Sequence, residues 1–196
     1  ATTPRATRSR VACWRSISSR ASTKSCAKLI GAGNYRLHKQ LGQLSLLLVA
    51  LMLILGYLVI RGAYANPEFK ILGLTPAGST IFPTSDLFFF VIAYVMGISF
   101  RTLSAAHKRF MCIAGLLILD PAVFRFILFG VEWPLWMADV IEASLFASLI
   151  VYDFIKLKRP HWASLMGIGL FIAMKYVRMT QGSEEWWLSL APWIFG

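Results

Sequence analysis

The chain has 196 residues, of which 57% are hydrophobic and only 15% charged, and its formal net charge is +11. A soluble domain of this length needs more polar surface, and it rarely contains several uninterrupted apolar runs of about 20 residues, the length of a helix that crosses a bilayer. We therefore expect an all-α membrane protein and exclude an ordinary soluble domain. The positive charge is concentrated near the start, because nine Lys and Arg residues precede residue 40 and the first acid is Glu68. This asymmetry predicts anionic lipid headgroups as partners, and not nucleic acid.

Residues 1–33 form a basic extension that is rich in Arg, Ser and Thr and contains no acid. Such a composition is typical of a disordered segment, and it is also typical of an organellar transit peptide. A third interpretation is that this segment is foreign to the natural protein. The sequence leaves these three interpretations open.

From residue 34 the chain predicts one helical membrane domain, 34–196, with five apolar runs. We expect a bundle of about five transmembrane helices over residues 44–60, 85–100, 109–130, 136–155 and 161–179. Asp120 and Pro121 interrupt the third run, and proline in a helix removes a backbone donor and clashes with the preceding turn. A kink at midspan is therefore predicted, with Asp120 either bonding the freed backbone or transferring protons.

The fourth apolar run contains pairs of small residues spaced four apart. Such pairs allow the close approach of another helix. They are Ala143 with Ala147 and Ser144 with Ser148. The tail after residue 183 is rich in tryptophan and predicts an interfacial anchor.

The basic residues of the predicted connections fall on one side of the membrane. Threading five helices back and forth places on that side a set of cations that includes Lys39, Arg101, Lys108, Lys158 and Arg159. Connections rich in Lys and Arg mark the cytoplasmic face. The sequence thus predicts a bacterial inner (plasma) membrane protein with its C-terminus outside, or an organelle membrane protein if residues 1–33 are a transit peptide.

The same threading places all three histidines at the predicted cytoplasmic ends of helices. They are His38, His107 and His161, and Asp153 lies at the same level. Neutral imidazole is a good ligand for transition metals and for haem iron. Each histidine also lies beside Lys or Arg, which is typical of interfacial residues that bond to helix ends. A haem or metal site, a protonation switch and a purely structural role are therefore all open interpretations.

A second group of polar residues is predicted toward the opposite face, within the spans. Charges at membrane depth cost about 2.5–3.5 kcal/mol each, so they should face inward and pair. Asp139 and Glu142 lie three apart on one predicted helix, and Lys175 and Arg178 lie three apart on another. We expect a buried polar cluster with these members: Asp86, Arg125, Asp139, Glu142, Lys175 and Arg178. It is interpreted either as mutual neutralisation, or as a ligand site or proton path.

Four segments resemble a family of uncharacterised bacterial multipass membrane proteins. RLHKQLG (36–42) is similar to its His-x-x-Leu-Gly lead-in, and AHKRFM (106–111) to its His-Lys-Arg-Leu-Met turn. VYDFIKLKRPHWASLMG (151–167) is similar to its Tyr-Asp, basic loop and His segment, and the C-terminal tail matches as well. The resemblance implies that the family pattern also fills these positions: His38, Asp86, His107, Arg125, Asp139, Asp153, His161 and Arg178. It implies a multipass membrane fold and no particular activity.

No nucleophile–base pair, phosphate loop or metalloprotease spacing is present, and the three cysteines form no CxxC motif. We therefore expect a protein without enzymatic activity, acting as a subunit or accessory factor of a larger membrane complex with other membrane subunits as partners. The alternatives are a haem- or metal-binding redox protein that uses the three histidines, and a small proton-coupled transporter.

Overall fold

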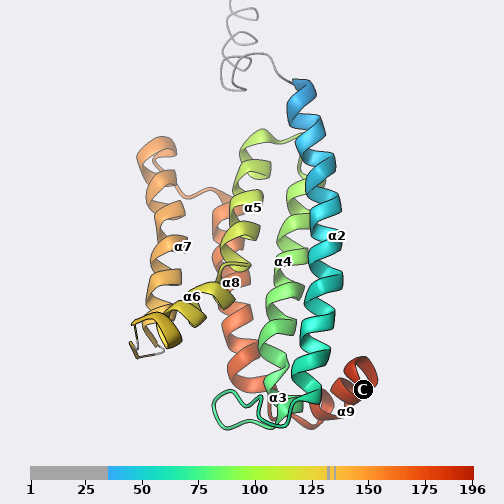
Figure 1. Ribbon diagram of the computed structural model, residues 1–196. Coiled ribbons are helices and arrows are strands. Elements are labelled where there is room, and N and C mark those ends of the chain that lie inside the picture. The colour runs from blue at the N-terminus through green and yellow to red at the C-terminus, as the bar shows by residue number, and fades with distance from the viewer. Residues whose placement is uncertain (1–34, 132, 135) are drawn as a thin grey trace, which may run out of the picture. The chain divides into compact units, whose positions relative to one another are not determined.

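The computed structural model describes residues 35–131, 133–134 and 136–196, and all regular elements in these ranges are helical (Figure 1). They are α2 (Tyr35–Ala65), α3 (Pro76–Ser79), α4 (Ile81–Ser99), α5 (Ser104–Leu117), α6 (Asp120–Arg125), the π-helix η2 (Phe126–Val131), α7 (Trp136–Leu157), α8 (Trp162–Gln181) and α9 (Glu185–Phe195). The predicted all-α class is confirmed. The basic extension predicted over residues 1–33 lies outside the described residues.

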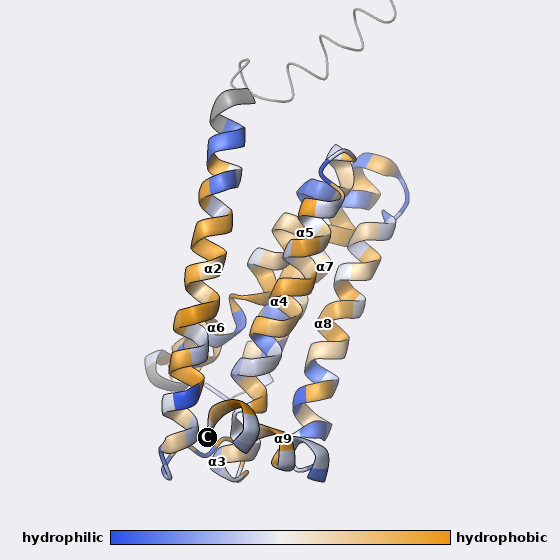
Figure 2. Ribbon diagram, turned by 90° about the vertical axis from the view of Figure 1, so that its right-hand side faces the viewer, coloured by the Kyte–Doolittle hydropathy of each residue, from blue (hydrophilic) through white to orange (hydrophobic). Residues whose placement is uncertain are grey.

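The chain divides into two units, residues 1–52 and 53–196, and each is described by itself. In the second unit α4 packs mainly against α5 and α8, α5 also contacts α7 and α8, and α7 contacts α6 and α8. The core between these helices includes Phe89, Phe110, Ile113, Leu117 and Met174. This unit is a helical bundle, and hydrophilic residues gather toward its helix ends (Figure 2).

Two stretches of the described residues are long and apolar enough to cross a membrane. They are His38–Ala65, within α2, and Pro76–Ser99, which includes α4. Nearly all large apolar side chains of α2 are exposed, among them Leu47, Ile54 and Val59. A helix that is apolar on every side is stable in lipid and poorly suited to water.

The segment that the sequence predicted as one helix, 109–130, is divided in the structure. α5 ends at Leu117, and α6 begins at Asp120 and leaves α5 in a new direction (Figure 1). Pro121 causes the break, because it offers no N–H to the carbonyl group four residues before it. The chain continues instead through turns in which the N–H groups of Ala122 and Val123 donate to the carbonyl of Leu119.

The small residues predicted to allow close helix approach on the fourth span are exposed, at 143, 144, 147 and 148. Glycines of other helices make the close contacts. A Cβ atom on Gly167 of α8 would lie 2.7 Å from Cγ1 of Ile113 on α5, and one on Gly97 of α4 would lie 2.9 Å from Sδ of Met111. Such distances are too short for packed atoms, so glycine is needed where α5 meets α4 and α8.

The tryptophan-rich tail forms α9, which is packed within the second unit. Ile60, Ile81, Trp187, Ala191 and Phe195 form one apolar cluster. The indole Nε1–H of Trp187 donates to the carbonyl oxygen of Ala77 at 3.0 Å. Trp193, in contrast, is 90% exposed. The tail therefore has a packed face and an exposed Trp193, and its role as an interfacial anchor stays a prediction.

Candidate functional site

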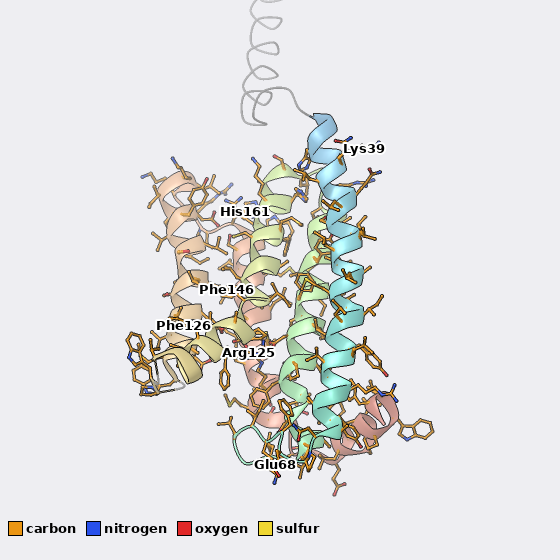
Figure 3. All side chains as sticks on the ribbon, viewed as in Figure 1. Lys39, Glu68, Arg125, Phe126, Phe146 and His161 are labelled. Carbon is orange, nitrogen blue, oxygen red and sulfur yellow. The ribbon has the colours of Figure 1, made fainter. Side chains whose placement is uncertain are left out.

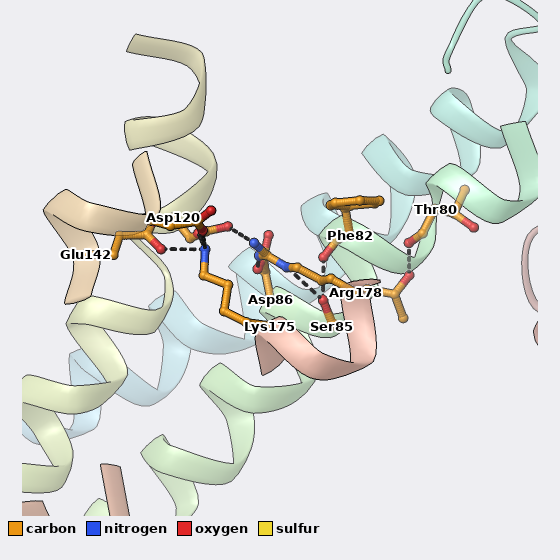
Figure 4. Close-up of polar contacts among 10 residues, drawn as sticks. Thr80, Phe82, Ser85, Asp86, Asp120, Glu142, Lys175 and Arg178 are labelled. Carbon is orange, nitrogen blue, oxygen red and sulfur yellow. Dashed lines mark hydrogen bonds and ion pairs between the residues drawn. The ribbon is translucent and has the colours of Figure 1, made fainter. Parts of the chain in front are cut away.

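Charged side chains of four helices meet inside the second unit (Figure 4). We call this group the charged cluster. Its members are Asp86 from α4, Asp120 from α6, Asp139 and Glu142 from α7, and Lys175 and Arg178 from α8. The spacing of three residues on α7 and on α8 directs each pair to one side of its helix, where the two pairs face each other.

Lys175 lies among three carboxylates. Its Nζ atom is 2.7 Å from an oxygen of Asp120, 2.7 Å from one of Asp139 and 2.7 Å from one of Glu142. The ammonium group has three protons, so each carboxylate can receive one. This single cation therefore links α6, α7 and α8.

Arg178 connects the other side of the cluster to α4. Its guanidinium forms ion pairs with Asp86 and Asp120. Its Nε–H also donates to Oγ of Ser85 at 3.2 Å. Asp120 is thus shared between the two cations, and it joins the helices that Lys175 and Arg178 contact.

The helix break before α6 determines where Asp120 lies. Because Pro121 ends the α5 hydrogen-bond ladder, the chain turns and Asp120 becomes the first residue of a new helix. An acid in a first turn is also favoured by the helix dipole. The sequence treated Asp120 as a separate midspan residue, whereas the structure makes it a member of the charged cluster.

Most of the cluster is inaccessible. Asp86 is 4% exposed, Asp120 4%, Glu142 2% and Arg178 5%. Asp139 is the member at the edge, because 48% of its side chain is exposed. The cluster contains four carboxyl groups and two cations, so full ionisation would leave a net charge of −2 in a largely buried site.

Glu142 has few partners for a buried acid, as does Asp86, which has one ion pair and a buried Oδ1 atom without a hydrogen bond from a described residue. The Oε2 atom of Glu142 pairs with Lys175, but its Oε1 atom accepts no hydrogen bond from any described residue and is buried. Asp120, by comparison, has ion pairs on both oxygens, with Lys175 on Oδ1 and Arg178 on Oδ2. A buried carboxylate oxygen without a donor is costly in the ionised form.

Arg125 does not belong to the charged cluster, which corrects the sequence interpretation. Its side chain is exposed at the end of α6 (Figure 3), and the described residues offer it no ion pair. Arg125 is the last residue of α6, so its position follows the direction of this helix after the break and not the direction of α5 (Figure 1). A straight helix over 109–130 would have placed Arg125 among different residues.

A second polar group lies at the opposite ends of α7 and α8. Asp153 is 0% exposed, and its Oδ1 accepts a hydrogen bond from Nε of Arg109 at 3.0 Å. Its Oδ2 accepts from the backbone N–H of His161 at 3.0 Å. Asp153 therefore joins α5, α7 and the start of α8. The sequence placed Asp153 with the histidines and did not identify Arg109 as its partner.

His107 and His161 both use Nδ1 for local contacts. In His107 this atom lies 2.7 Å from the carbonyl oxygen of Gly97, so it donates its proton there. In His161 it accepts from the N–H of Ala163 at 3.1 Å and caps α8.

Burial lowers the pKa of His161 below its usual value, and the positive charge of Arg109 lowers this pKa further. An open pocket lies beside it, lined by Leu157, Arg159, Pro160, His161 and Trp162.

The predicted haem or metal site has no structural support in the part of the chain that is described. No group of three or more His, Cys, Asp or Glu side chains there is arranged to hold a metal ion. His38 is exposed and belongs to the first unit, 1–52, whereas His107 and His161 belong to the second. The three-histidine site stays a prediction.

Two contributors were missed by sequence reasoning. The pairing of Arg109 with Asp153 could have been predicted, because the threading placed both residues at the same membrane level. Ser85 had none, since a serine before an acid at a helix start is equally typical of a cap.

Comparison with protein-family models, curated proteins and solved structures found no match for this chain.

Proposed function

We propose that this protein is a small proton-coupled carrier that spans a bacterial inner membrane five times. The observation that supports this is the charged cluster, which holds four carboxyl groups against two cations at positions that are almost fully buried. Ionisable residues within membrane spans are rare and are typical of proton relays and substrate paths.

Complete mutual neutralisation of the charges would need equal numbers of acids and bases. Two of the carboxyl groups in the cluster have no cation of their own, and each charge at membrane depth costs about 2.5–3.5 kcal/mol. Such an excess is relieved when protons or another cation bind. An arrangement that gains and loses protons in this way is the central part of a proton-coupled carrier.

The membrane arrangement rests on helix length and charge. α7 has 22 residues and α8 has 20, which is enough to span, but the cluster lowers their mean hydropathy. Their charges are paired inside the unit, so those helices can still face lipid with apolar side chains. In this proposal the third span consists of α5, with 14 residues, continued by α6 after the break. Five spans, with the 101–108 and 156–161 connections cytoplasmic, agree with the positive-inside rule.

The competing proposal is a non-enzymatic subunit of a larger membrane complex. In that case the cluster would only hold α4, α6, α7 and α8 together. This alternative requires a stable partner that co-purifies from native membranes.

Proton movement in liposomes tests the proposal. The full chain is reconstituted with a pH-sensitive dye inside, and small amines, amino acids and carboxylic acids are added outside in turn. We expect proton movement that depends on at least one solute class and is absent from protein-free liposomes. No proton movement with any class, together with a membrane protein that co-purifies reproducibly, would overturn the carrier and favour the subunit.

A further inference from the structure

We propose that Glu142 is the proton-binding residue of the charged cluster, and that Asp139 and Lys175 form its connection to the surface. This inference rests on the proposed function and assigns the proton to one side chain. It follows from the partners of each carboxyl group, which differ sharply within the cluster.

Each of the other three carboxylates has a second cation, a cation shared with fewer acids, or a partly exposed side chain. Asp86 pairs with Arg178, and Asp120 pairs with Lys175 and Arg178 through its two oxygens. Asp139 pairs with Lys175, and its side chain is 48% exposed, so solvent or lipid headgroups can also solvate it.

Glu142 differs from these carboxyl groups in both its exposure and its partners. It is 2% exposed, and its Oε1 atom accepts no hydrogen bond from a described residue. Among the described residues it pairs with one cation, Lys175, which is shared with two other carboxylates. A proton on Glu142 removes one uncompensated charge and converts Oε1 or its partner oxygen into a donor.

The acceptor for that donor is already adjacent. The carboxyl oxygens of Asp120 and Glu142 each lie 2.7 Å from the same Nζ atom, so these two groups are close neighbours. Two carboxyl groups that share a site cannot both ionise freely, and one of them keeps a proton. Since Asp120 has cations on both oxygens, Glu142 is the one that keeps it.

Groups on every helix around Glu142 agree with this assignment. Asp139 on α7 and Asp120 on α6 add negative charge, while Lys175 and Arg178 on α8 are divided among all four acids. Asp86 on α4 is held by Arg178. The basic side chain of α5 that pairs with an acid, Arg109, is bound to Asp153 in the second polar group.

Figure 4 shows the contact between Glu142 and Lys175, and the ion pair of the same lysine with Asp139 extends this contact toward the surface. The half-exposed Asp139 and the buried Glu142 both lie 2.7 Å from Nζ of Lys175. A proton that reaches Asp139 is therefore one residue away from Glu142 through the ammonium group. Protonation of Glu142 neutralises its side of the Lys175 ion pair, which weakens one link between α7 and α8.

Infrared spectroscopy of the full chain in lipid tests this assignment. At neutral pH we expect the C=O stretching band of a buried, protonated carboxylic acid, and we expect it to be lost in Glu142→Gln. Glu185→Gln is the control, because it removes a carboxyl group that is exposed and lies outside the charged cluster, so it should retain the band. Absence of the band in the unmodified protein, or its persistence in Glu142→Gln, would overturn the assignment.

Glu142→Asp covers the case in which the glutamine variant does not fold. It keeps a carboxyl group at a new depth, so the band should shift in frequency. An unshifted band in Glu142→Asp would also overturn the assignment. The two proposals can fail separately. Solute-driven proton movement without the infrared band would overturn only the assignment of the proton to Glu142. The band without proton movement would overturn only the proposal that the protein is a carrier.

Discussion

At the scale of single residues, the number of donors around a carboxyl group distinguishes the two buried acids of α7. Asp153 receives Nε–H of Arg109 and the N–H of His161, whereas Glu142 shares one lysine and has an oxygen without a donor. Both are almost fully buried. The first is therefore suited to remain ionised and to hold helices together, and the second is suited to bind a proton.

Replacing Asp153 with alanine should destabilise the protein by about 3–5 kcal/mol, because Arg109 loses its partner in a mostly buried site. The measurement is thermal or chemical unfolding in detergent, followed by circular dichroism. Lys156→Ala on the same helix is the control, because Lys156 is exposed and its loss should change stability by less than about 0.5 kcal/mol. Equal effects of the two variants would show that the Asp153 contacts do not stabilise the fold.

His161 should make stability depend on pH. Its pKa is lower in the folded protein than the usual 6.5, so folding favours the neutral ring. The stabilisation is complete above about pH 6.5 and is lost as the pH falls from there through the lowered pKa of the folded state. Unfolding measured between neutral and mildly acidic pH should show this decrease.

His161→Asn is the control for this pH dependence, since asparagine caps helices but does not titrate. The decrease should be smaller in that variant. An identical pH profile for both proteins would assign the effect to another group.

The sequence predicted much of the charged cluster because its signals are local. Spacing of three residues placed Asp139 with Glu142 and Lys175 with Arg178, and the cost of buried charge required that they pair. The membership of Asp120 and the exclusion of Arg125 were not predictable in the same way. Both depend on the direction of α6 after the break, and the hydrophobic pattern does not specify a direction.

At the scale of helices, glycine determines how closely α5 approaches α8. Gly167→Ala should destabilise the protein by about 1–3 kcal/mol, because the added Cβ would lie 2.7 Å from Cγ1 of Ile113. Gly169→Ala is a matched control on the same helix, with no atom within 4 Å of the added Cβ. It should be neutral or stabilising by up to about 1 kcal/mol through helix propensity. Thermal unfolding of both variants checks this, and equal shifts would contradict the packing argument.

The close contacts between helices could not be assigned to particular small residues from the sequence pattern. The sequence favoured the small residues of 143–148 as the contact surface, yet they are exposed and the contacts fall on Gly97 and Gly167. Small residues allow close approach without requiring it. Which small residues are used depends on the rotation of each helix about its axis, which the hydropathy of these runs does not determine.

At the scale of the whole molecule, the proposed orientation is based on the distribution of basic residues over the connections. We expect alkaline phosphatase fused after Gly196 to be active, because that enzyme folds only outside the cytoplasm, and the same enzyme fused after Lys158 to be inactive. Reporter activity in cells measures both. Activity of the Lys158 fusion with an inactive Gly196 fusion would reverse the proposed orientation.

Solute-driven proton movement in liposomes tests the central claim most directly, when the unmodified protein, Asp139→Asn and Glu142→Gln are compared at equal protein density. The account predicts movement by the unmodified protein, a reduced rate for Asp139→Asn because the route to the surface is impaired, and complete loss for Glu142→Gln. A Glu142→Gln variant that moves protons at the unmodified rate would contradict it.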